Sequence, residues 1–138
     1  MYNRYQDIDK FITDVNELRM DKDGGVYISS EEDYGIMVDL EEQMDKFEEL
    51  KSQIVFAAEH IGELDNMVQR YSKKRWNETV EDYVALVYID EPNLITLEYW
   101  GARVNTQYLV EFEYTDNQFV LKSFGMNKDI PADWDKEE

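Results

Sequence analysis

The spacing of apolar residues divides the chain into a helical first half and a strand-forming second half. Between residues 5 and 18, apolar side chains recur every three or four positions, which predicts a helix with one buried face. Asp23-Gly24-Gly25 follows, and glycine after the last apolar turn is typical of a helix end. We therefore expect an N-terminal helix within residues 1–25. Two short strands, at 26–28 and 35–38, are expected within residues 26–39.

Residues 40–75 form the most regular stretch. Its apolar residues alternate spacings of three and four: Phe47, Leu50, Ile54, Ala57, Ile61, Leu64, Val68 and Tyr71. An unbroken helix of this length would extend roughly 50 Å, whereas a compact chain of this size has a radius of gyration of about 14 Å. We therefore expect the helix either to break or bend, with Gly62 as the weak point, or to project and self-associate through this seam.

From Tyr83 the hydrophobic period changes to two, as expected for strands. Residues 83–89 and 94–100 predict two strands joined by a turn, and residues 104–114 predict a third with one apolar face. Asp116-Asn117 suits a tight hairpin before a fourth strand at 119–124. Residues 83–125 are thus expected to form a β-meander, followed by an acidic tail, 126–138, whose Trp134 folds back onto the body. Helices on one face of such a sheet are the economical arrangement.

The predicted fold class is α+β, in a single domain spanning residues 1–138. Two or three helices pack on a four-stranded antiparallel β-meander, and two short strands are additional to it. The length of 138 residues suits one domain. The hydrophobic content of 43% and the aromatic content of 14% are enough for a packed core.

Charge changes the picture most. The chain has 32 acidic residues against 14 Lys and Arg, for a formal net charge of −18. Nucleic acids and anionic membranes repel such a surface, while a basic protein is attracted to it. The first nine residues lack the apolar core of a signal peptide, and no apolar run approaches the ~20 residues of a membrane span. Together with the absence of cysteine, these features predict a cytoplasmic protein without a membrane partner.

Candidate chemistry is sparse. His60 is the only histidine, and a lone helical histidine is more often a solvated or packed residue than a catalyst. Residues 21–32 do not match the pattern of a calcium-binding loop, because a loop starting at Asp21 has Gly25 where an acidic ligand is needed. No phosphate loop, nucleophile elbow or metal-binding helix occurs. We therefore expect no enzyme activity, no catalytic residue, no metal site and no cofactor.

The candidate partner-binding residues combine acids with large aromatic side chains, a composition suited to a basic protein partner if the aromatics are exposed and do not fill the core. They are Glu31, Glu32, Asp33, Asp39, Glu41, Glu42, Asp45, Glu48, Glu49, Trp76 and Trp100. Because the acids are concentrated before the predicted sheet, the expected contact face comprises the N-terminal helix, the acidic turn and the start of the long helix. The sheet would then serve as a scaffold.

Four features bear on a resemblance to known proteins. They are the small size, the acidity, the lack of cysteine, and helices followed by a meander with residues 95–101 and 104–114. In these respects the chain resembles the small immunity proteins that bacteria pair with toxins. The resemblance implies stoichiometric, non-catalytic inhibition of a basic toxin or nuclease. A phage-type anti-CRISPR or anti-restriction nucleic-acid mimic is an alternative with the same electrostatics. A structural or adaptor domain that self-associates through its long helix is another, and a small-ligand pocket or enzyme is a third. Monomer and homodimer both stay open.

Overall fold

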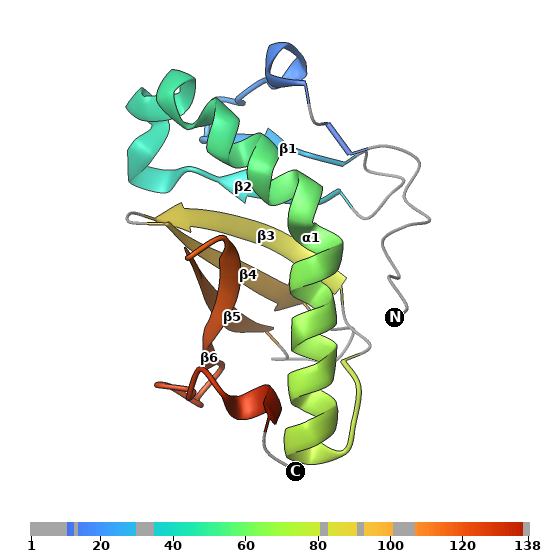
Figure 1. Ribbon diagram of the computed structural model, residues 1–138. Coiled ribbons are helices and arrows are strands. Elements are labelled where there is room, and N and C mark those ends of the chain that lie inside the picture. The colour runs from blue at the N-terminus through green and yellow to red at the C-terminus, as the bar shows by residue number, and fades with distance from the viewer. Residues whose placement is uncertain are drawn as a thin grey trace.

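The computed structural model describes residues 11–12, 14–29, 35–80, 83–90, 93–100 and 107–136. These form one long helix and one sheet, an α+β fold (Figure 1). The helix is α1, Phe47–Trp76. The strands are β1, Gly25–Tyr27; β2, Met37–Asp39; β3, Tyr83–Asp90; β4, Leu94–Trp100; β5, Gln107–Thr115; and β6, Gln118–Phe124. Short 3-10 helices are η2, Val15–Glu17; η4, Glu41–Lys46; and η5, Trp134–Lys136.

The six strands lie in the sheet in chain order, β1 to β6. Every neighbouring pair is antiparallel except β2 and β3, which are parallel. Parallel neighbours need a long crossover, and η4 with α1 supplies it. The predicted meander is confirmed as β3 to β6, and the two predicted short strands extend the same sheet. Asp116 and Asn117, at the predicted hairpin, both have positive φ, as tight hairpin turns require.

The expectation of two or three helices is wrong. In the described part of residues 1–25 the chain forms only the short η2 and otherwise runs beside β1. Met20 bridges Val26 and Phe11 bridges Ser29, while the amide of Ile12 donates to the carbonyl of Ile28 at 2.8 Å. Pairing with the sheet edge therefore overrides the local helical spacing. Residues 1–10, where the predicted helix would begin, lie outside the described residues.

The expected break at Gly62 is also wrong. Gly62 is buried inside α1, which is helical over all 30 residues; the irregular residue is Gln43, in η4, with φ −98° and ψ 17°. At about 45 Å, α1 lies lengthwise along the molecule (Figure 1), so a spherical estimate of size does not apply. The apolar seam from Leu50 to Tyr71 is buried, and the chain's own sheet occupies it.

Helix α1 covers one face of the sheet. The Phe56 ring packs edge-on against Tyr114, and Tyr71 packs against Phe124. The hydroxyl of Tyr99 donates to Asp65 Oδ1 at 2.6 Å. Strand alternation places residues 108, 110, 112 and 114 on this side, as predicted, and residues 109, 111 and 113 on the opposite face, which we call the open face.

Both edges of the sheet are partly covered by the chain itself. At the β1 edge, the amide of Asp21 donates to the carbonyl of Gly25 at 2.9 Å. At the β6 edge, the amide of Ile130 donates to the carbonyl of Lys122 at 3.1 Å. The tail then returns to the core: Trp134 is only 7% exposed and packs edge-on against Tyr71. The predicted fold-back of Trp134 is confirmed.

Candidate partner-binding surface

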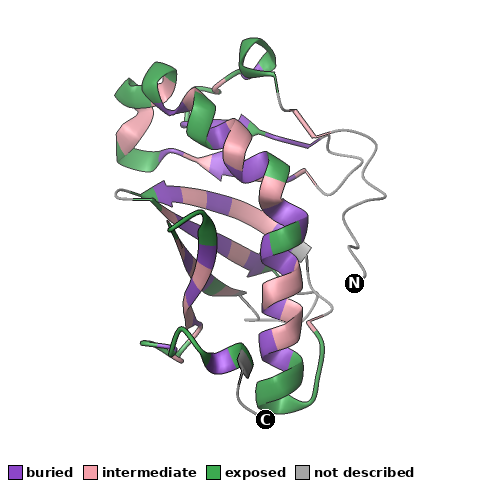
Figure 2. Ribbon diagram, in the orientation of Figure 1, coloured by how far each residue is buried: buried purple, intermediate pink, exposed green. Residues whose placement is uncertain are grey.

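An exposed row of carboxylates marks the start of the long helical segment. We call it the acidic ridge; it consists of Glu41, Glu42, Asp45, Glu48 and Glu49, all exposed. They lie within the nine residues 41–49, which comprise η4 and the start of α1. Figure 2 shows exposed residues along the outer side of η4 and of the first turn of α1. Five of the acids singled out in the sequence therefore lie in one short exposed segment.

The ridge is anchored to the sheet at its beginning. Asp39, at the end of β2, accepts a hydrogen bond from the amide of Glu41 at 3.0 Å. The next residue, Leu40, is buried and its amide donates to the carbonyl of Gly24 at 3.0 Å. The side-chain amide of Gln43 donates to the carbonyl of Ile89 at 3.2 Å. The carboxylates therefore project from a backbone that is fixed to β1, β2 and β3.

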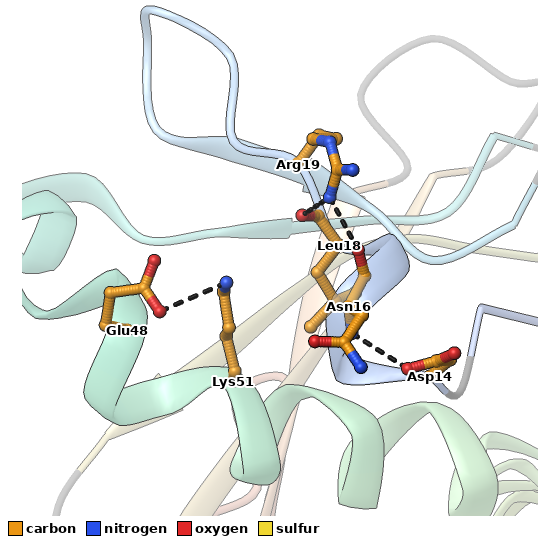
Figure 3. A network of polar contacts seen from close by, with 6 residues as sticks. All are labelled: Asp14, Asn16, Leu18, Arg19, Glu48 and Lys51. Atoms are coloured by element: carbon orange, nitrogen blue, oxygen red, sulfur yellow. Dashed lines mark hydrogen bonds and ion pairs between the residues drawn. The ribbon is translucent and has the colours of Figure 1, made fainter.

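Basic side chains near the ridge leave most of its charge in place. Lys51 pairs with Glu48 at 3.1 Å, and Lys46 is exposed within the same segment. Arg19, which follows η2, donates from its guanidinium to the backbone carbonyls of Asn16 and Leu18 at 2.7 and 2.8 Å (Figure 3). Acids still outnumber bases along this segment, so a cationic partner is favoured there.

A second group of polar residues lies on the open face of the sheet. Tyr88 donates to Glu98 Oε1 at 3.2 Å, and the indole N–H of Trp100 donates to the other carboxylate oxygen of Glu98. Burial and the neighbouring Glu98 carboxylate, with smaller contributions from Asp39 and Glu41, raise the pKa of Tyr88 to about 12. Tyr88 thus lies in the electrostatic field of both Glu98 and the beginning of the ridge.

The two predicted aromatic anchors do not join the ridge. Trp76 is the last residue of α1, roughly 40 Å along the helix from the ridge, where its ring packs against Tyr71 and Phe124. Trp100 is on the open face and is 49% exposed. The remaining candidates, Glu31, Glu32 and Asp33, lie outside the described residues.

The residues weighed for chemistry contact neighbouring backbone and rings. His60 Nδ1 lies 2.7 Å from the carbonyl of Phe56, an acceptor, so this nitrogen carries the proton. The His60 ring also packs against Phe56 and Phe119. Asp21 accepts backbone N–H groups of Asp23 and Gly25 at 2.8 and 2.9 Å. These bonds, that of Gly25 first, lower the pKa of Asp21. The Asp21 side chain therefore stabilises the turn formed by residues 21–25.

The described residues contain no group of three histidine, cysteine or acidic side chains placed to hold a metal. A shallow hollow of about 50 Å³ beside α1 is lined by uncharged residues, namely Gln53, Phe56, Ile89, Asn93, Leu94, Ile95 and Tyr114. None of the described helices is both long enough and apolar enough to cross a membrane.

Comparison with protein-family models, with curated proteins and with solved structures finds no match to this chain. The surface itself therefore carries the functional argument. Sequence reasoning did not single out Glu98, Tyr88 or Leu109, because their meeting depends on the register between β3, β4 and β5. The one signal in the sequence was Leu109, an apolar residue on the polar side of an alternating strand.

Proposed function

We propose that this protein is a non-catalytic inhibitor that binds a basic protein through its acidic ridge. The partner is a toxin or nuclease whose positively charged active site the ridge covers, as in an immunity protein. The observation that carries this proposal is the ridge itself: five exposed carboxylates within nine residues of an anchored segment, in a chain of net charge −18. A bacterial cytoplasm is the proposed location, because the chain contains no cysteine.

The electrostatics of the ridge determine how such a complex would behave. Exposed carboxylates accelerate the encounter with a cationic partner, and the effect weakens as salt screens the charges. A backbone already fixed to the sheet loses little conformational entropy on binding, which favours affinity. We therefore expect a one-to-one complex with a dissociation constant in the nanomolar range, on the order of well-packed inhibitor complexes, and an association rate that falls with ionic strength.

The test begins with capture from the native host. The intact chain is immobilised, incubated with lysate at low salt and washed, and the bound proteins released at high salt are identified by mass spectrometry. The captured basic protein is then purified, and its enzymatic or toxic activity is titrated with the chain. We expect activity to reach zero near one equivalent.

Three outcomes would contradict the proposal. The first is that capture returns no basic protein. The second is that the captured protein keeps its activity in the complex. The third is that its affinity for the chain does not change with salt. A captured host-defence nuclease, in place of a toxin, would assign the same inhibitory surface to a phage-type nucleic-acid mimic.

A further inference from the structure

A single row of side chains crosses the open face of the sheet. Strand pairing aligns Tyr27 with Met37, Met37 with Leu86, Leu86 with Glu98, and Glu98 with Leu109. At about 4.8 Å per strand, the row spans roughly 19 Å. Its polar groups are the Tyr27 hydroxyl and the Glu98 carboxylate, and the rest of the row is apolar. We call this row, with the neighbouring Trp100, the sheet platform.

Several large apolar side chains of the platform are exposed. Tyr27 is 43% exposed, Leu109 47% and Trp100 49%. On the α1 side, most of the sheet's large side chains are buried, and Tyr108 and Tyr114 are partly buried. Clustered exposed apolar residues with a polar rim mark interaction sites more often than scattered ones do. The platform therefore has the composition of a binding surface.

The charges around the platform have one dominant sign. The described strands carry five acids, Asp39, Asp90, Glu98, Glu111 and Glu113, and one base, Lys122. Glu98, Glu111 and Glu113 alternate with residues that face α1, so they lie on the open face. Glu98 is oriented by two neutral donors, Tyr88 and Trp100. The two ion pairs of the described residues, Lys51 with Glu48 and Arg70 with Asp135, involve none of these three acids.

We propose that the sheet platform is a second docking surface of this protein, which receives an arginine side chain and flanking aliphatic residues of its basic partner. The guanidinium binds Glu98 through paired N–H groups and lies against the Trp100 ring. The aliphatic neighbours cover Leu86 and Leu109 on either side of Glu98. This inference rests on the proposed function, since it extends the contact area of the same basic partner beyond the acidic ridge.

Charge and shape select this occupant over others. A second copy of the chain would bring Glu98, Glu111 and Glu113 against the same acids, and like charges in an interface cost affinity. Strand addition at a sheet edge is disfavoured because residues 20–21 and 127–130 already pair there. Arginine is favoured over lysine because its planar group makes paired hydrogen bonds to a carboxylate and stacks on an aromatic ring. The adjoining Asp39 and Glu41, which act on Tyr88, connect the platform with the ridge.

The probe for the test is an acetylated, amidated octapeptide of alternating leucine and arginine. The matched probe replaces each arginine with citrulline, which has a similar shape and no charge. Binding to the intact chain is followed in ¹H–¹⁵N NMR spectra through the indole N–H signals of Trp76, Trp100 and Trp134. We expect the Trp100 signal to shift saturably with the arginine peptide. The signals of Trp76, at the far end of α1, and of the buried Trp134 should stay in place.

Variants locate the binding site. Glu98→Gln keeps an acceptor for Tyr88 and removes the charge, and we expect affinity for the arginine peptide to fall about tenfold. Leu109→Lys, at an exposed position, should weaken it at least as much. Asp116→Asn, an equal charge change in the β5–β6 hairpin, should alter it less than twofold. Equal affinity for the citrulline peptide, binding without a Trp100 shift, or an unaffected Glu98→Gln variant would each overturn the inference.

These results are independent of the capture experiment. If a basic partner is captured but its affinity is unchanged by Glu98→Gln and Leu109→Lys, the platform is refuted and the proposed function stands. If no basic partner exists, the proposed function fails, and the peptide titration still shows whether the platform selects arginine.

Discussion

The hydrogen bond between Tyr99 and Asp65 offers the sharpest test of how the helix is fixed to the sheet. Asp65 is 2% exposed and Tyr99 is fully buried, and their oxygens are 2.6 Å apart. Tyr99→Phe removes the donor hydroxyl and leaves the ring in place. The ring stacks on Tyr108 with centroids 5.3 Å apart, so the substitution leaves no large cavity. The decrease in the free energy of unfolding therefore reports the loss of this hydrogen bond to Asp65.

Removing a buried side-chain hydrogen bond costs on the order of 1–3 kcal/mol, and Asp65 Oδ1 keeps the side-chain amide of Gln69 as a second donor at 3.4 Å. We therefore expect Tyr99→Phe to lower the free energy of unfolding by about 2 kcal/mol. With a urea dependence of about 2 kcal/mol per molar, the midpoint of urea unfolding would shift by about 1 M. Tyr114→Phe is the matched control, since that ring packs against Phe56 and Phe119 and keeps those contacts. It should cost less than about 0.5 kcal/mol.

Asp65→Asn completes a double-mutant cycle. If the hydroxyl and the carboxyl group stabilise each other directly, the cycle with Tyr99→Phe gives a coupling energy above ~1 kcal/mol. Equal stability of the Tyr99→Phe and wild-type proteins in urea would refute the reasoning. So would a coupling energy near zero, because the two groups would then act separately.

Three further predictions follow from the core, the tail and the open face. Ile61→Ala, at a fully buried position of α1, should cost about 2–5 kcal/mol in chemical unfolding, whereas Glu63→Ala on the exposed side should be nearly neutral; similar costs would contradict the burial of the seam. Trp134→Ala should cost about 3 kcal/mol, because this ring packs on Tyr71 and Arg70; an unchanged melting temperature would contradict its packing. The phenol of Tyr88 should ionise near pH 12 in the folded protein, so stability should be lost as pH rises from about 10, the ordinary tyrosine pKa, towards 12. NMR titration of the Tyr88 ring checks this, and Glu98→Gln should lower the pKa; titration near 10 in the wild type would contradict it.

The second half of the fold was predictable because its information is local. Alternation from Tyr83 onward, together with the turn at Asp116 and Asn117, determined the meander. The long apolar seam from Phe47 to Tyr71 determined the helix and the side that it buries. These features depend on the period of the sequence and on turn residues, which one segment contains by itself.

The N-terminal segment could not be predicted in the same way. Apolar residues between Phe11 and Met20 have helical spacing, but pairing of Met20 with Val26 and of Phe11 with Ser29 depends on contacts across the chain. A break at Gly62 was expected because a compact, spherical molecule has no room for so long a helix. The sheet instead packs along the length of α1, so the helix continues through Gly62. Likewise, the row from Tyr27 to Leu109 joins five strands, and its composition follows from register, which no single strand encodes.

The same distinction holds for the candidate surface. The acids from Glu41 to Glu49 were predictable as one exposed segment because they are close in sequence. Their positions relative to Trp76 and Trp100 were not predictable, because Trp76 lies at the far end of α1 and Trp100 lies on the open face of the sheet.

The central claim is that the position of the acids, and not only their number, determines binding. Two variants with the same net charge test it. One carries Glu41→Gln, Glu42→Gln, Asp45→Asn and Glu49→Gln in the ridge. The other carries Glu78→Gln, Asp116→Asn, Asp129→Asn and Asp133→Asn at exposed positions elsewhere.

The measurement is the dissociation constant of each variant for the captured basic partner, by calorimetry at low and at physiological salt. Exposed charges contribute roughly 0.2–1 kcal/mol each, so the ridge variant should bind on the order of tenfold or more weakly, with a reduced dependence on salt. The control variant should bind within about twofold of the wild type, as distant surface changes usually do. Equal weakening of both variants, or of neither, would contradict a binding function of the ridge.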